Sequence, residues 1–153
     1  MDKLPLKDKL CVGICTLFGL GYTPLLGGTL ASVVAVVVFL FIKIRIYFLI
    51  LTVISILLSF LLTARAEKIF KEKDCKKIII DDFSGMLLAL SFTPYDIRYI
   101  VCAFILFRIF DAFKIPPIDK IERFPGATGV VGDDLMAGFY SLAALQIVRL
   151  FVR

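Results

Sequence analysis

Two pairs of adjacent aspartates, Asp81–Asp82 and Asp133–Asp134, each stand directly before a strongly apolar stretch of the chain. Carboxylate oxygens suit a hard cation, and magnesium is the hard cation that commonly meets substrate phosphate. A bound magnesium ion can lower the pKa of a water molecule and offset negative charge while a phosphorus centre is attacked. We therefore predict that the four carboxylates form a magnesium site, with Asp82 and Asp134 also among the catalytic residues. Helix capping, worth about 0.5–2 kcal/mol for each cap, is the alternative, but it explains only one aspartate per helix.

Three charged residues, Arg108, Asp111 and Lys114, follow one another at spacings of three residues. On a helix, with about 100° per residue, this spacing spreads them over one face. Arg108 lies within an apolar run, where a charged side chain costs roughly 2.5–3.5 kcal/mol on insertion scales and is usually functional. We predict that Arg108 binds non-reacting phosphate oxygens as a two-pronged fork and that Lys114 binds them as a point charge. Asp111 would orient Arg108 or act as a base, unless all three are ordinary boundary charges of a membrane helix.

Glycines at positions 19, 21, 27 and 28 precede Thr29 and a long apolar run. This pattern predicts a glycine-rich loop that allows close backbone approach, with Thr29 capping the helix that follows. The N–H groups at the start of that helix would bind an anion. Gly28 and Thr29 are therefore candidate substrate-binding residues, although glycines are also common packing residues in membrane helices.

The composition indicates an integral membrane protein, because 60% of the 153 residues are hydrophobic and the mean hydropathy is +0.96. Several segments are apolar around the whole helix, unlike the amphipathic helices of a soluble domain. We predict one all-α domain over residues 1–153, a polytopic membrane helical bundle with about five transmembrane helices and a short N-terminal or re-entrant helix within residues 10–29. The predicted crossings are 25–42, 46–64, 78–95, 99–113 and 135–152.

Basic residues are distributed unevenly over the loops of this predicted topology. Twelve lysines and arginines fall on the side of the N-terminus and the loops 65–77 and 114–134, against five on the other side. The positive-inside rule makes the richer side cytoplasmic. The same topology places all the candidate site residues at this one membrane face.

Other classes of function find little support in the sequence. The net charge of +5 does not indicate nucleic-acid binding, because the basic residues lie between apolar runs and lack an aromatic stacking platform. The chain has no histidine, which excludes Ser-His-Asp and Cys-His catalysis. The four cysteines, at positions 11, 15, 75 and 102, support neither a zinc site nor a disulfide framework.

Four ordered stretches resemble the phosphatidylglycerophosphatase A family: 19–32 (GLGYTPLLGGTLAS), 81–86 (DDFSGM), 107–118 (FRIFDAFKIPPI) and 126–138 (GATGVVGDDLMAG). The resemblance implies a magnesium-dependent enzyme of the bacterial inner (plasma) membrane with its active site facing the cytoplasm. Such an enzyme hydrolyses the terminal phosphomonoester of the anionic phospholipid phosphatidylglycerophosphate, giving phosphatidylglycerol and phosphate. This chain departs from the family's usual motifs in four places. It has Gly-Gly-Thr at 27–29 in place of Pro-Gly-Thr, and Asp-Asp at 81–82 in place of Asp-Glu. It has Lys-Ile at 114–115 in place of Lys-Pro, and Gly-Ala-Thr-Gly at 126–129 in place of Gly-Gly-x-Gly. The charge at every motif position is retained.

Two other kinds of membrane protein are alternatives to a lipid phosphatase. A small membrane cation or proton transporter would use buried aspartates and an arginine equally well, but glycine-rich loops and a lysine beside the carboxylates favour phosphate. A phospholipid synthase acting on a CDP-alcohol would need an Asp-Gly-x-x-Ala-Arg helix, which the sequence lacks. The sequence predicts neither the oligomeric state nor the selectivity for head group and acyl chains.

Overall fold

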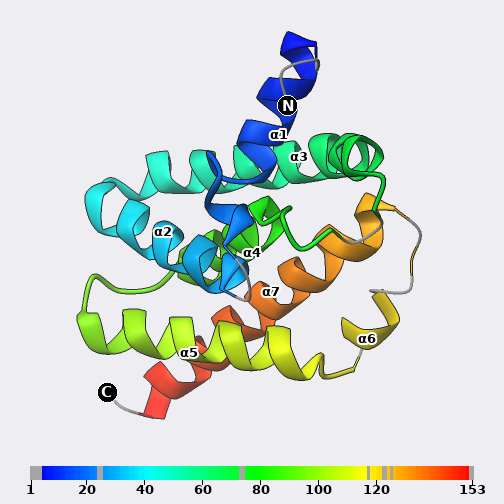
Figure 1. Ribbon diagram of the computed structural model, residues 1–153. Helices are drawn as coiled ribbons and strands as arrows, with labels where there is room; N and C mark the ends of the chain where they lie inside the picture. The colour runs from blue at the N-terminus through cyan, green and yellow to red at the C-terminus, as the bar shows by residue number, and fades with distance from the viewer. Residues whose placement is uncertain are drawn as a thin grey trace.

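The computed structural model describes residues 5–23, 26–72, 75–116, 118–121, 124 and 126–151. All regular structure within these ranges is helical, which confirms the all-α prediction. The elements are α1 (Leu6–Cys15), the 3-10 turn η1 (Leu20–Tyr22), α2 (Gly27–Phe41), α3 (Arg45–Phe70), α4 (Ile80–Leu90), α5 (Ile97–Phe113), α6 (Ile118–Ile121) and α7 (Ala127–Phe151). Figure 1 shows α4 in the middle of the bundle, with α2, α3, α5 and α7 around it.

Only α3 and α7, among the described helices, are long and apolar enough to cross a membrane. The α2 helix is apolar but has 15 residues, and α4 has 11. A helix of 11 residues is about 16 Å long, whereas the hydrocarbon core of a bilayer is about 30 Å thick. The predicted number of about five crossings is therefore not confirmed and remains a prediction.

The central helix α4 is enclosed by its neighbours, and all of its residues except Asp82 and Leu88 are buried. Apart from its two aspartates the sequence IDDFSGMLLAL has no charged position, which is the composition expected of a helix covered on every side. Met86 belongs to a core that also contains Phe48 of α3 and Phe107 of α5. The core thus holds α4 in place, and with it the aspartates of its first turn.

Two glycines allow α4 and α7 to touch through their backbones. A Cβ added at Gly138 would overlap the carbonyl oxygen of Gly85, and a Cβ added at Gly85 would lie 2.6 Å from the carbonyl oxygen of Asp134. Any side chain at either position would force the helices apart. This crossing brings the first turn of α4 next to the aspartate pair of α7.

The N-terminal region forms a helix followed by a glycine turn, as predicted, but the helix begins at Leu6, before the predicted range of 10–29. Gly19 in the turn has a φ of 99°, in the left-handed region. The segment 75–79 lies against the end of α1, because the amide of Ile79 donates to the carbonyl oxygen of Cys15 at 2.9 Å. The connection 65–77, which the sequence predicts as a solvated helical loop, is helical in its first part, because α3 continues to Phe70. The helix ends where Lys71 takes a φ of 55°.

Two predicted helix starts are wrong. The last helix begins at Ala127 and not near residue 135, so Asp133 and Asp134 lie in its second turn and do not open it. The glycines read as a loop are mostly helical, and Gly132 is needed for packing, since a Cβ there would lie 2.7 Å from the Ile121 side chain. The α2 helix begins at Gly27 without a side-chain cap, so Thr29 lies in the first turn and does not cap it.

Candidate active site

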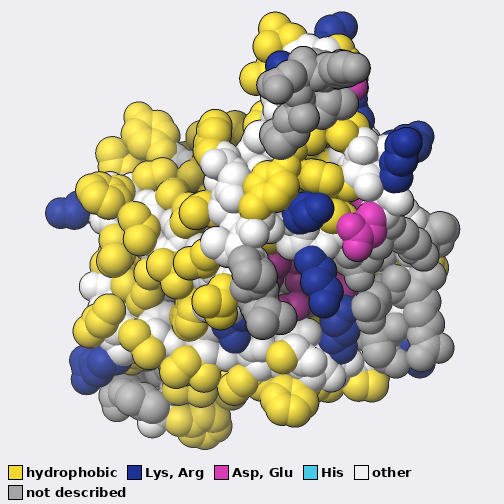
Figure 2. Space-filling view, viewed as in Figure 1, with side chains coloured by type: hydrophobic (Ala, Val, Ile, Leu, Met, Phe, Trp, Pro, Cys, Tyr) yellow, Lys and Arg dark blue, Asp and Glu magenta, His cyan; other side chains and the backbone are white. Residues whose placement is uncertain are grey.

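A pocket of about 700 Å³ opens beside the first turn of α4 and is walled by α2, α5, α7 and the segment 75–79. Figure 2 shows acidic side chains recessed in this hollow behind lysine and arginine side chains. The lining contains every predicted site residue except Thr29, namely Gly28, Asp81, Asp82, Arg108, Asp111, Lys114, Asp133 and Asp134. Residues from four separate stretches therefore meet in one place, as the predicted topology required.

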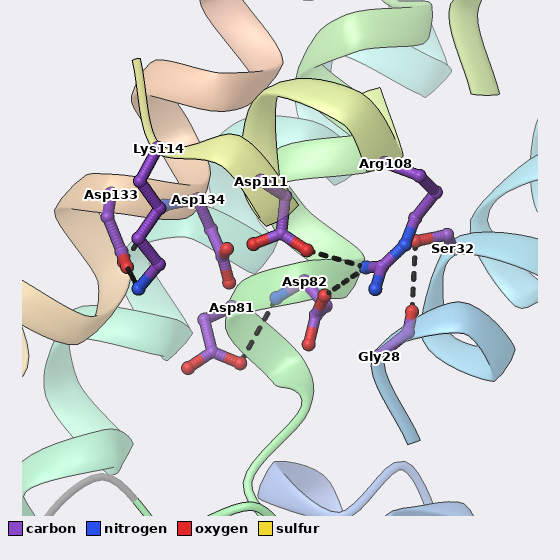
Figure 3. Close-up of polar contacts among 9 residues, drawn as sticks. All are labelled: Gly28, Ser32, Asp81, Asp82, Arg108, Asp111, Lys114, Asp133 and Asp134. Carbon is purple, nitrogen blue, oxygen red and sulfur yellow. Dashed lines mark hydrogen bonds and ion pairs between the residues drawn. The ribbon is translucent and has the colours of Figure 1, made fainter. Parts of the chain in front are cut away.

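Three of the four predicted metal ligands face one another. Asp81, Asp82 and Asp134 each offer a carboxylate oxygen, and these oxygens all lie within 4.8 Å of one another (Figure 3). Asp81 also accepts a hydrogen bond from the backbone amide of Asp82 at 3.1 Å. A buried cluster of carboxylate oxygens without nitrogen or sulfur donors fits a hard divalent cation.

Asp133 has a different partner. Its carboxylate accepts from the Lys114 ammonium at 2.9 Å and from the backbone amide of Asp134 at 3.0 Å. The structure thus pairs Asp133 with Lys114 at the edge of the cluster. Lys114, at a φ of 43°, ends α5 and reaches back across the pocket to α7.

The acidic cluster is electrostatically unfavourable without a counter-ion. Asp81 and Asp134 are buried, and burial disfavours the charged form of a carboxyl group. Asp82 lies within the same group of facing carboxylates, where its ion pair with Arg108 offsets only part of the negative charge. Carboxylates crowded in this way repel one another, and a bound cation would favour their charged forms.

Arg108 joins two helices at the pocket wall. Its Nη1 donates to Asp82 Oδ1 at 2.8 Å and to Asp111 Oδ2 at 2.9 Å (Figure 3). The predicted pairing of Arg108 with Asp111, three residues further along α5, is therefore present. Because both contacts use one nitrogen of a planar fork, the guanidinium can donate to a ligand through its other nitrogens.

Gly28 is required for the shape of the site. A Cβ added there would lie 2.5 Å from both carboxylate oxygens of Asp82. The carbonyl oxygen of Gly28 accepts from the Ser32 hydroxyl at 2.9 Å within the first turn of α2 (Figure 3). Thr29, by contrast, is not among the residues that line the pocket.

Sequence reasoning missed the basic residues at the pocket entrance. Lys76 and Lys77 line the pocket together with Gly21 and Tyr22. The sequence placed both lysines in a solvated cytoplasmic loop, and the only signal of a site role was their position shortly before the Asp81–Asp82 pair.

Carboxylates, an arginine and lysines gathered in one pocket of an apolar helical protein fit a membrane-associated enzyme that acts on a phosphate ester. Residues 13–149 match the family described as Phosphatidylglycerophosphatase A. The chain belongs to this family.

Similar proteins carry two kinds of name. A protein of Bacteroides thetaiotaomicron, provisionally named a phosphatidylinositol-3-phosphatase, is 31% identical over 89% of this chain and 91% of its own length. The phosphatidylglycerophosphatase A of Escherichia coli K12 is 29% identical over 86% of this chain and 78% of its own length. That of Haemophilus influenzae is 30% identical over 67% of this chain and 64% of its own length. No solved structure matches the chain.

Proposed function

We propose that this protein is a magnesium-dependent lipid phosphatase that hydrolyses the terminal phosphomonoester of phosphatidylglycerophosphate to phosphatidylglycerol and inorganic phosphate. The observation that carries the proposal is the position of Arg108, which lies in the same pocket as the buried cluster of Asp81, Asp82 and Asp134. A phosphate ester needs both kinds of group, a cation site for its charge and a fork of donors for its oxygens. The family and the names of two relatives support the same substrate.

In this proposal Asp81, Asp82 and Asp134 hold the magnesium ion, with Asp133 at the edge of the site. When bound, the ion supplies Lewis acidity and a water of lowered pKa. Arg108 binds the non-bridging oxygens of the scissile phosphate, and Asp111 fixes the guanidinium through its 2.9 Å ion pair. Lys114, held by Asp133, adds positive charge to the same site.

The chemistry is the hydrolysis of one phosphorus–oxygen bond. Water adds to the phosphorus and gives up a proton as the bond to the glycerol oxygen breaks. That oxygen gains one proton and leaves as an alcohol, so the step needs no proton beyond those of the water. Charge grows on the non-bridging oxygens during this step, and donors that are already positioned for those oxygens lower the barrier most. Asp111 contributes by keeping Arg108 in that position.

One observation favours a second substrate, a phosphatidylinositol 3-phosphate. The Bacteroides relative, which aligns with 89% of this chain, has the provisional name of a phosphatidylinositol-3-phosphatase. Hydrolysis of a 3-phosphate on an inositol lipid would use the same groups, because the scissile bond is again that of a phosphomonoester. The transporter considered from the sequence has no comparable support.

Phosphate release by the purified full-length protein decides between these substrates. We expect turnover of phosphatidylglycerophosphate in detergent micelles, loss of that turnover with EDTA and recovery with added magnesium. Phosphatidylinositol 3-phosphate is measured in parallel. Faster hydrolysis of the inositol lipid would replace the proposed substrate, and full activity in EDTA would remove magnesium from the proposal.

We further propose that the protein spans the inner membrane several times, with the pocket on the cytoplasmic side and the C-terminus outside. The bias of basic residues supports this orientation. Cys75 is a poor labelling site because only 2% of it is exposed. Glu72 is exposed on the same segment, so a Glu72→Cys variant lacking the four native cysteines should react with a membrane-impermeant thiol reagent only after cell lysis. Reaction in intact cells would reverse the orientation.

A further inference from the structure

Lys76 and Lys77 form a basic rim at the mouth of the pocket, and the proposed reaction does not use them. Both line the pocket and both are exposed, whereas Asp81 and Asp134 are buried deeper in it. The pocket therefore has two levels, an acidic floor with Arg108 and the basic rim above it.

The position of Lys77 is fixed by its surroundings. A Cβ added at Gly21 would overlap the carbonyl oxygen of Lys77, so the rim and η1 touch through their backbones. The Lys77 ammonium lies 5.9 Å from the ring centre of Tyr22 and 5.4 Å from that of Phe70. These two rings contact each other edge to face, with centres 6.4 Å apart. Cation–π contacts of this kind hold the ammonium near one place before a ligand binds.

The charges of the floor leave no cation for a second anionic group. Five carboxylates line the pocket there, and the described cations beside them, Arg108 and Lys114, are assigned to the scissile phosphate in the proposed function. A divalent cation would offset part of the remaining negative charge and serve the scissile phosphate. A substrate that carries another phosphate must therefore find its positive partner elsewhere, and the rim is the part of the pocket lining that offers one.

The surface beside the rim is apolar. The turn that carries Tyr22 also exposes Phe18, at 92%, and Leu20, at 37%. In a glycerophospholipid the phosphodiester lies between the acyl chains and the rest of the head group. A lipid that enters with its phosphomonoester towards the floor and its chains towards this apolar turn thus places its diester at the rim.

We propose that Lys77, supported by Lys76, binds the non-scissile phosphodiester of the phospholipid and selects substrates that carry two phosphate groups. The inference rests on the proposed function, because it assumes that a phospholipid monoester occupies the floor. Phosphatidylglycerophosphate and inositol lipid phosphates share the diester, so the recognised chemistry is the phosphodiester itself.

The test is the kinetics of Lys77→Met in the full-length protein, with phosphatidylglycerophosphate in mixed micelles. We expect KM to rise about fivefold to tenfold, the scale of one partly exposed charge-assisted contact, with kcat within about twofold of the wild type. The inhibition constant of inorganic phosphate, which has no diester, should stay unchanged. Lys77→Arg should restore KM.

Lys68→Met is the matched control. Lys68 is exposed in the last turn of α3 and is not part of the pocket lining. Its replacement by methionine removes the same charge as Lys77→Met. Its KM should equal that of the wild type. Lys77→Gln is measured in the same way should Lys77→Met not fold.

Three results would overturn the proposal. An unchanged KM in an active Lys77→Met enzyme would overturn this inference alone. Parallel increases in KM and in the phosphate inhibition constant would assign Lys77 to a general attraction for anions. No turnover of phosphatidylglycerophosphate or of an inositol lipid phosphate by the wild type would remove the proposed function and this inference with it.

Discussion

Arg108 contacts the N-terminal end of α4 and Arg45 lies at its C-terminal end, but the two guanidinium groups bind different partners. Arg108 pairs with the carboxylates of Asp82 and Asp111 at 2.8 and 2.9 Å. Arg45 donates to two backbone carbonyl oxygens, that of Ser91 at 2.7 Å and that of Thr93 at 3.0 Å. One arginine thus meets charged side chains in a pocket, and the other meets neutral backbone.

The partners of Arg45 indicate a structural role. The last carbonyl groups of a helix lack donors within the helix, and a cation there also interacts favourably with the helix dipole. The Arg45 guanidinium lies 5.6 Å from the ring centre of Tyr95, which stacks on Phe39 at 4.5 Å. An arginine in an apolar chain is therefore not a sign of catalysis by itself, and the type of partner separates the two roles.

The largest effect is expected at the acidic cluster. Asp82→Asn should lower phosphate release per folded molecule by about 10³-fold, because it removes both a proposed metal ligand and the partner of Arg108. Asp96→Asn, at the start of α5, is the control. Asp96 caps α5 through the Arg98 amide at 2.9 Å, and asparagine caps as well as aspartate. Equal activity of Asp82→Asn and Asp96→Asn would contradict a catalytic role of the acidic cluster.

Within the acidic cluster, Asp133 and Asp134 are expected to differ in their effect on activity. Asp133 is paired with Lys114 and lies outside the group of three facing carboxylates. We expect Asp133→Asn to lose clearly less activity than Asp134→Asn, measured at several magnesium concentrations. If asparagine were tolerated at all four positions of the two pairs, the metal site would be wrong.

Arg108→Lys tests the arginine directly. Lysine cannot reproduce a two-pronged contact, so turnover should fall about 10²-fold, the scale of losing one electrostatic stabiliser, roughly 3 kcal/mol. Arg45→Lys should retain near-normal turnover in whatever protein folds. Rates are normalised to folded protein at saturating magnesium, and a loss smaller than about fivefold would remove Arg108 from the catalytic residues.

Gly28→Ala is expected to cost about tenfold in turnover, since the new methyl group would displace the Asp82 carboxylate from the cluster. Gly13 in α1 provides the control because a Cβ there meets no atom within 4 Å. Gly13→Ala should leave turnover unchanged and stabilise α1 by about 0.5–1 kcal/mol. Unchanged turnover for Gly28→Ala would show that the site tolerates movement of Asp82.

The smallest effect on activity is expected at Arg45. Arg45→Gln should lower the free energy of unfolding by about 1–3 kcal/mol, because buried carbonyl groups lose a charged donor, while turnover per folded molecule stays normal. Thermal unfolding in detergent measures the change, with exposed Lys43→Gln as the control. A loss of turnover without a loss of stability would contradict the structural role.

Local spacing in the sequence predicted what lies within one helix. The Arg108–Asp111 pair follows from a separation of three residues, and the structure has it at 2.9 Å. The Arg108–Asp82 pair spans 26 residues, and only the predicted topology, which brought both to one face, suggested that they meet. The direct contact depends on how α4 and α5 pack, which no local pattern contains.

Glycines explain the errors. The residues around Gly132 were read as a loop because glycine disfavours helices, but Gly132 lies inside α7 where Ile121 leaves no room for a side chain. Thr29 was read as a cap because threonine often precedes a helix, whereas α2 begins two residues earlier. Gly132 is thus explained by a neighbour in another helix, and Thr29 by a helix start that the sequence placed two residues too late.

The contact between Gly85 and Gly138 has a consequence for ion selectivity. It sets the distance between α4 and α7 by their backbones, and with it the separation of Asp81 and Asp82 from Asp134. For the proposed cation site this fixes the spacing of the two backbones that carry the ligands, so we expect discrimination by ionic radius, with magnesium preferred over calcium.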